Sequence, residues 1–164
     1  MKMIIPAILT DNIKDLEDKL KKLTGLVDWV QIDILDGIFV KNNSVQLKDI
    51  AKVNAIAKNI NIEIHLMVKD PERYFTACQD ASIKRVIFHV EAVKNVKEIL
   101  KKADRFSFQK GIALNPKTDI KKMYPYLKNI DVVLVMGVNP GFQGQKFIIS
   151  TLKKIKEIKK KMPY

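Results

Sequence analysis

The sequence has little cysteine, glycine or tryptophan and no long apolar run. Its single cysteine, Cys78, excludes an internal disulfide framework and is typical of a reducing compartment. No stretch approaches about 18 consecutive apolar residues, the minimum for a membrane-spanning helix. The apolar part of the opening segment, MKMIIPAILTDN, is too short for a secretory signal. We therefore expect a cytoplasmic protein that has no membrane partner.

The charge is strongly positive but is not arranged as in most nucleic-acid readers. Lysine and arginine number 30 against 18 acidic residues, which gives a net charge of +12. Almost all of it is lysine, spread over amphipathic segments such as KDLEDKLKKL and LKKIKEIKKK among acidic residues. This pattern indicates a solvated surface and no nucleic-acid partner, and its positive potential favours an anionic small substrate.

The 164 residues, 47% of them hydrophobic, are the size of one soluble domain with a sizeable core. Short runs rich in Val and Ile alternate with segments of helical periodicity. The expected strands are 3–9, 28–35, 61–68, 84–90, 108–114 and 131–138. The expected helices are 11–24, 45–59, 71–81, 93–104, 117–128 and 146–161.

A strand about every 25 residues with a helix between predicts right-handed parallel crossovers and therefore an α/β fold. The strands are continuously apolar, so both faces of the sheet should be covered. Two layouts satisfy this, an open doubly wound sheet and a closed eight-stranded barrel. No G-x-G-x-x-G motif follows the first strand, which disfavours dinucleotide binding, and the six units are two fewer than a closed barrel needs.

Polar residues gather where the expected strands end, which is where chemistry gathers in both layouts. Asp33 lies within an apolar strand, where an uncompensated carboxylate costs several kcal/mol, so it is the strongest functional candidate. Asp36 precedes Gly37 and is more typical of a turn. His65 is expected beside Asp33 on the next strand, and His89 is either a backbone-bonded imidazole or part of the site.

Two further features point to the same end of the strands. Met67 and Met136 are expected to pack in the core or to form a soft lid over a substrate. The segment NPGFQGQKF, residues 139–147, follows the sixth strand and precedes the last helix. Its glycines let backbone N–H groups approach an anion, and a helix N-terminus behind it would add positive potential. A phosphate cradle is therefore expected there.

Five segments, DILDGIFV, EIHLMVKDPERY, IFHVE, GIALNPKT and VLVMGVNPGFQGQKF, resemble the ribulose-phosphate 3-epimerase family in order and spacing. The resemblance covers essentially the whole chain. It implies an α/β fold of the TIM (β/α)8 barrel family, here truncated to about six β/α units. Residues 1–164 are accordingly expected to form a single barrel domain that lacks the last two units.

The resemblance also implies an activity, the interconversion of D-ribulose 5-phosphate and D-xylulose 5-phosphate by proton transfer at C3 through an ene-diolate. Asp33 matches the catalytic base, and Asp33 and His65 match ligands of a divalent metal, Zn or Fe. The positions matching substrate-binding residues are Ala7, His65, Met67, Met136, Gly141, Phe142, Gln143 and Gly144.

The chain departs from the family pattern at several of these positions. Ala7 replaces a serine, and Gln143 replaces the middle glycine of the phosphate loop. Gln31 stands where the family has a histidine ligand, and a neutral amide binds zinc poorly. The second catalytic aspartate belongs to strands beyond the six. Only two of four expected metal ligands are therefore present, and we expect weak metal binding.

Three alternatives follow from these departures. The chain is a fragment of a longer epimerase, a catalytically silent homologue that binds a sugar phosphate, or an epimerase for another ketose phosphate such as allulose 6-phosphate. An incomplete barrel leaves unpaired backbone groups and apolar side chains at its edge, so a homo-oligomer is also expected.

Overall fold

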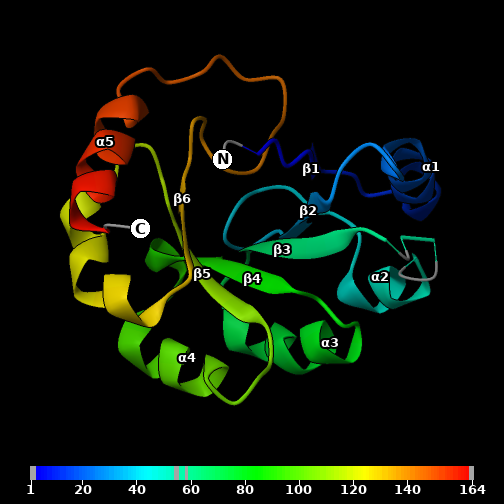
Figure 1. Ribbon diagram of the computed structural model, residues 1–164, viewed down its shortest axis with the longest axis horizontal. Helices are drawn as coiled ribbons and strands as arrows, with labels where there is room; N and C mark the ends of the chain where they lie inside the picture. The colour runs from blue at the N-terminus through cyan, green and yellow to red at the C-terminus, as the bar shows by residue number, and fades with distance from the viewer. Residues whose placement is uncertain (1–2, 54–55, 58, 163–164) are drawn as a thin grey trace.

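The computed structural model describes residues 3–53, 56–57 and 59–162, which form one parallel six-stranded sheet surrounded by helices (Figure 1). The strands follow one another in the order β1-β2-β3-β4-β5-β6. They are β1 (Ala7–Ile8), β2 (Trp29–Leu35), β3 (Asn61–Met67), β4 (Arg85–His89), β5 (Gln109–Leu114) and β6 (Val132–Val135). A doubly wound sheet reverses its order at a switch point, whereas a barrel does not. The sequential order therefore confirms the barrel type of α/β fold.

Helical segments connect successive strands and lie around the outer side of the curved sheet (Figure 1). The α-helices are α1 (Ile13–Leu23), α2 (Leu47–Val53), α3 (Phe75–Asp80), α4 (Val96–Ala103) and α5 (Thr151–Lys161). The 3₁₀ segments are η1 (Pro71–Tyr74), η2 (Val90–Ala92) and η3 (Ile120–Asn129). None of the helices in the described ranges is long and apolar enough to cross a membrane.

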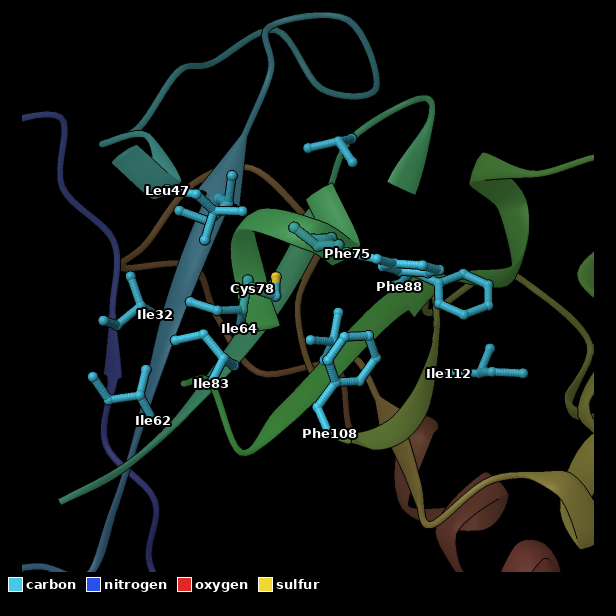
Figure 2. Close-up of a cluster of buried hydrophobic side chains, with 14 of the residues drawn as sticks. Ile32, Leu47, Ile62, Ile64, Phe75, Cys78, Ile83, Phe88, Phe108 and Ile112 are labelled. Carbon is cyan, nitrogen blue, oxygen red and sulfur yellow. The ribbon is translucent and has the colours of Figure 1, made fainter. Parts of the chain in front are cut away.

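The main hydrophobic core lies between the sheet and the outer helices. Alternate strand residues such as Ile32, Ile64 and Phe88 point to this layer and pack against Phe75 and Cys78 of α3 (Figure 2). Because strand side chains alternate between faces, the intervening residues of the same strands point into the barrel interior. The site residues at odd positions of β2 and β3 are therefore directed inward by the same pattern that builds the core.

The interior is closed at the amino ends of the strands by a buried ion pair. Arg85 Nη1 donates to Glu63 Oε2 at 2.7 Å, and the Arg85 guanidinium lies 4.3 Å from the ring centroid of Trp29. The Arg85 Nε group also donates to Gln109 Oε1 at 2.9 Å. The polar side chains at this end of the interior are therefore paired with one another.

Several of the expected elements differ from the structure. The first strand is shorter than 3–9, because β1 pairs with β2 only at Ala7 and Ile8. The expected helix over 117–128 is the 3₁₀ segment η3, which contains Pro125, a residue that cannot continue α-helical hydrogen bonding. Part of the expected 45–59 helix lies outside the described residues, and α2 begins at Leu47.

The last helix also begins later than expected, at Thr151 instead of residue 146. Ile148 N–H donates to Gly137 O at 2.8 Å, which ties the preceding segment to the end of β6 in a non-helical conformation. The expectation that a helix N-terminus lies directly behind the glycine loop is therefore wrong.

Candidate active site

A pocket of about 230 Å³ opens at the carboxyl ends of β1, β2, β3 and β6. Its lining combines inward-facing strand residues with the loop that follows β6. The residues are Ala7, Leu9, Gln31, Asp33, His65, Met67, Leu134, Val135, Met136, Gly137, Val138, Asn139, Gly141, Phe142 and Gln143. The structure thus brings together all of the expected site residues except Gly144.

Asp33 is the only carboxylate that lines this pocket, counting the residues that the structure describes. It pairs in register with His65 of the neighbouring strand, and Gln31 precedes it by two residues on the same face. Gln31 Nε2 donates to Asp33 Oδ1 at 2.8 Å, and His65 Nδ1 lies 3.0 Å from the same oxygen. The Asp33 side chain is 14% exposed and that of His65 is 1% exposed. Asp33 is therefore held by its neighbours and is open only to the pocket.

Behind His65 a chain of polar side chains continues away from the pocket. His65 Nε2 lies 2.8 Å from His89 Nε2, and His89 Nδ1 lies 3.2 Å from Glu91 Oε2. His89 has no exposed surface, and the ring of Phe39 lies over it at a centroid distance of 4.9 Å. The sequence allows two interpretations of His89, as a backbone-bonded imidazole or as a site residue. In the structure both of its ring nitrogens contact side chains of this network.

Glu91 lies at the far end of the network, where its carboxylate accepts hydrogen bonds. Its Oε1 atom accepts from the backbone N–H of Asn115 at 2.8 Å and from the Thr118 hydroxyl. Burial raises the pKa of Glu91, but hydrogen bonds from His89, Thr118 and Asn115 outweigh it and lower the pKa to about 2. Burial lowers the pKa of His89 below its ordinary value. Near neutral pH, Glu91 is therefore ionised.

These contacts limit how protons can be arranged. Three contacts join Asp33, His65, His89 and Glu91 in a row, and each needs one hydrogen or one cation between its two polar atoms. A neutral imidazole supplies one hydrogen, so the three contacts are all complete only when an additional proton or a cation is present.

The donor set fits a tightly bound divalent metal poorly. Asp33 Oδ1 and His65 Nδ1 are two adjacent atoms that could bind a cation, but the Gln31 amide nitrogen, a donor, faces the same oxygen. Within the described ranges, no group of three or more His, Cys, Asp or Glu side chains could hold a metal ion. A catalytic zinc site needs three protein ligands as a rule.

Asp36 belongs to a turn and does not line the pocket. Its Oδ1 accepts from the backbone N–H groups of Ile38 at 2.8 Å and Phe39 at 2.9 Å, and its Oδ2 accepts from Lys69 N–H at 2.8 Å. Burial opposes ionisation, yet these bonds lower the pKa of Asp36. The interpretation of Asp36 as a turn residue is confirmed. Phe39, which lies in the same turn, packs its ring against that of His89.

The glycine loop after β6 faces Asp33 across the pocket. Gly141 has a φ of +109°, and a Cβ there would lie 3.1 Å from Val40 Cβ, so glycine is favoured by both backbone and space. Asn42 Nδ2 donates to Gly141 O at 2.7 Å, and Gln145 Nε2 donates to the carbonyls of Asn139 and Phe142, both at 2.7 Å. Several of the loop's carbonyls are thus bonded within the protein.

Sequence reasoning missed two parts of the site. Gly137 lines the pocket, and a Cβ at this position would lie 2.6 Å from Phe147 Cε2, a close approach that no sequence motif announces. Thr118 falls at the start of the expected helix 117–128, whereas in the structure its hydroxyl donates to Glu91 Oε1.

Sequential parallel strands with outer helices define a protein of the β/α-barrel class, with an acid–imidazole pair at the carboxyl ends of its strands. Comparisons with solved structures agree on the fold. Phosphoribosyl anthranilate isomerase from Thermus thermophilus aligns over 94% of this chain and 72% of its own, with a TM-score of 0.65 and 12% identity. A mutant tryptophan synthase α-subunit from Pyrococcus furiosus aligns over 94% of this chain and 74% of its own, with a TM-score of 0.66 and 13% identity.

Sequence comparisons are more specific than the fold. Residues 3–164 match the Ribulose-phosphate 3 epimerase family. Ribulose-phosphate 3-epimerase of Bacillus subtilis is 33% identical over 158 residues, which are 96% of this chain and 72% of the relative. The enzyme of the same name from Schizosaccharomyces pombe is 32% identical over 163 residues, which are 98% of this chain and 72% of the relative. The chain belongs to the ribulose-phosphate 3-epimerase family.

Proposed function

We propose that the chain acts on a ketose phosphate as a 3-epimerase, with D-ribulose 5-phosphate and D-xylulose 5-phosphate as the substrate pair. The observation that carries this proposal is the Asp33 carboxylate, which faces a small pocket between His65 and the glycine loop. Family membership supports the reaction, and the glycine-containing loop after β6, which lines the same pocket as Asp33, is the candidate contact for the substrate's phosphate.

The first half of the reaction is the removal of the C3 proton by Asp33. The C3–H bond breaks, an O–H bond forms on the Asp33 carboxylate, and the electron pair moves towards the C2 carbonyl to give the ene-diolate. Met67 and Met136 line the pocket beside Asp33 and supply an apolar surface that excludes water from this intermediate. Gln31 and His65 hold the carboxylate in position while the proton moves.

Epimerisation also needs a proton donor on the opposite face of C3. No second carboxylate of the described residues lines the pocket, so the first half-reaction is the step that we assign to this part of the chain. We also propose that a divalent metal, Zn or Fe, binds here, but only weakly. Asp33 and His65 are the side chains that would hold it, Gln31 is a poor third ligand, and we assign no step to the ion.

The test is exchange of the C3 hydrogen of D-ribulose 5-phosphate in D₂O, followed by proton NMR. We expect the chain to incorporate deuterium at C3 and the Asp33→Asn variant to lose this exchange by about 100-fold or more, because an amide cannot accept the proton. Asp18→Asn, at an exposed position of α1, is the matched control and should exchange at the native rate. Equal exchange by Asp33→Asn and the control would refute the assignment of Asp33.

A second candidate function is binding of a sugar phosphate without turnover. It is favoured by Ala7 and Gln31, which replace residues of the family pattern, and by the single carboxylate in the pocket. It predicts that D-ribulose 5-phosphate binds, as shown by calorimetry, while no deuterium enters C3. An epimerase for another ketose phosphate, such as allulose 6-phosphate, would instead exchange that compound faster.

We also propose a cytoplasmic homo-oligomer whose partner is this small substrate and neither nucleic acid nor membrane. Several exposed apolar side chains support assembly, namely Ile4, Phe142, Phe147, Ile149 and Leu152. The buried Cys78 thiol has its pKa raised by burial to about 12, which suits an unreactive cysteine in a reducing compartment. Sedimentation velocity of the chain tests the assembly, and a monomer at all concentrations would contradict it.

A further inference from the structure

The glycine loop, residues 139–147, lies between β6 and α5 and lines the pocket with Asn139, Gly141, Phe142 and Gln143. A loop backbone attracts an anion through its N–H groups and repels it through its carbonyl oxygens. Whether this loop can bind a phosphate therefore depends on where its carbonyl oxygens are held. Two side chains that do not line the pocket, those of Asn42 and Gln145, bind these oxygens.

Gln145 joins two parts of the loop through its side-chain amide. Its Nε2 group donates to Asn139 O and to Phe142 O, both at 2.7 Å. An amide NH₂ group carries two hydrogens, so one is available for each carbonyl. Two carbonyls that are three residues apart are thus held on one nitrogen, which keeps the residues between them in a tight turn.

Asn42 binds a carbonyl between these two from the connection that follows β2. Its Nδ2 group donates to Gly141 O at 2.7 Å, and its Oδ1 atom accepts from the Asn43 backbone N–H at 2.9 Å. A backbone N–H only donates and a carbonyl only accepts, so these two partners allow one orientation of the Asn42 amide. The contact therefore ties the glycine loop to a segment about 100 residues earlier in the chain.

The N–H groups of the same loop have a different status. Among the described residues, no group accepts a hydrogen bond from the backbone N–H of Gly141, Gln143 or Gly144. Gly141 and Gln143 line the pocket. The loop therefore combines carbonyls that are bound by side chains with N–H groups that remain available, an arrangement that suits an anion.

We propose that Asn42 and Gln145 are positioning residues that hold the carbonyls of the glycine loop outside the pocket, so that its N–H groups remain available to the substrate's phosphate. This inference deepens the proposed function and rests on it for the identity of the anion. Neither side chain lines the pocket, so both act through the loop backbone.

The proposal separates binding from chemistry. Without one of these contacts the loop populates other conformations, and the affinity for a phosphate falls with the fraction of molecules that keep the competent one. Asp33 is held by Gln31 and His65, which belong to strands and not to this loop. The KM for C3 exchange should therefore rise, while kcat stays within about twofold of the native value.

Asn42→Asp and Asn43→Asp form a matched pair, because each replaces an amide by a carboxylate of the same shape and adds one negative charge. At position 42 the carboxylate still accepts from Asn43 N–H but places an oxygen against Gly141 O, where a donor is needed. The Asn43 side chain is exposed and, among the described residues, makes no hydrogen bond to the loop. The comparison of the two variants therefore isolates the contact from the charge.

We expect Asn42→Asp to bind inorganic phosphate about tenfold more weakly than Asn43→Asp does, as measured by ³¹P NMR titration. The affinity for D-ribulose 5-phosphate, measured by calorimetry, should fall by a similar factor. Equal affinities of the two variants would overturn the proposal. A variant that only loses folded protein would show a lower kcat with an unchanged KM, and this result would also contradict the positioning role.

Gln145→Met tests the second contact, since methionine has a similar shape and no donor. It removes two hydrogen bonds, so we expect phosphate affinity to fall by about 10- to 30-fold. Gln79→Met is the matched control, because Gln79 of α3 binds Ser107 N–H away from the pocket, and it should bind phosphate as the native chain does. Equal affinity of these two variants would contradict the role of Gln145. If Gln145→Met fails to fold, the aspartate pair still decides the proposal.

The binding experiments and the exchange assay fail separately. A chain whose variants lose phosphate affinity as expected, but which shows no C3 exchange, retains this inference and loses the proposed reaction. A chain that exchanges C3 with the same KM in both aspartate variants retains the reaction and loses this inference.

Discussion

Replacing Glu91 by glutamine should reduce the stability of the fold in a pH-dependent way, because the pKa of Glu91 in the folded chain is far from its ordinary value. The pKa falls from 4.5 to about 2. A group with a lowered pKa in the folded state stabilises it fully above the ordinary pKa and loses this contribution as pH falls towards the folded value. Glu91 should therefore stabilise the fold near neutral pH and progressively less between about pH 4.5 and pH 2.

The size of the effect follows from the shift. Each unit of pKa corresponds to about 1.4 kcal/mol, so the shift of Glu91 sets a ceiling of about 3 kcal/mol. The Glu91 side chain is 18% exposed, and solvent screening reduces the expected value to about 2 kcal/mol. Glutamine resembles the protonated acid in size and charge. The variant should accordingly lose about 2 kcal/mol at neutral pH and almost nothing in strong acid.

Urea unfolding of both chains at a series of pH values checks this expectation. The difference in free energy of unfolding should be constant above about pH 5 and should shrink as pH falls below 4.5. Glu98→Gln, an exposed change on α4, controls for the loss of one negative charge and should show a difference within about 0.5 kcal/mol. A difference between native chain and Glu91→Gln that does not vary with pH would refute the reasoning.

Two further predictions concern packing and the interior ion pair. Gly137→Ala should weaken D-ribulose 5-phosphate binding in calorimetry by about tenfold, because its Cβ lies 2.6 Å from Phe147 Cε2 and displaces that segment. Adding Phe147→Ala should restore affinity, and no rescue would contradict the steric cause. Glu63→Gln should cost about 3 kcal/mol in urea unfolding, because it leaves Arg85 buried without its charge partner. A loss no larger than that of Glu98→Gln would show that the ion pair is not stabilising.

The sequence predicts the fold because its local signals and its topology agree. Six apolar runs at regular spacing give the six strands of the sheet, and their periodicity of two places Gln31 and Asp33 on one face. The same periodicity and the parallel register bring His65 beside Asp33. Backbone geometry alone therefore predicts the centre of the site, once the strands are known.

The parts that the sequence does not predict depend on tertiary contacts. The late start of α5 results from the bond between Ile148 N–H and Gly137 O, and nothing in the local helical pattern indicates it. The role of Thr118 depends on Glu91, which is 27 residues earlier and belongs to another strand end. Such pairings are set by how neighbouring β/α loops meet, and one sequence without alignment contains no signal for them.

The two buried polar groups inside the sheet differ in one respect that connects structure to function. At the amino ends, Arg85 and Glu63 form a charge pair, and neither side chain lines the pocket at the other end of the strands. At the carboxyl ends, three contacts join Asp33, His65, His89 and Glu91 in a row, and only Asp33 and His65 of this row line the pocket. Polar groups that are withdrawn from water are costly unless they have partners, so the Asp33 carboxylate, which is 14% exposed, can find a further partner only on the pocket side. This difference between the two ends supports the proposal that the carboxyl ends of the strands carry the chemistry.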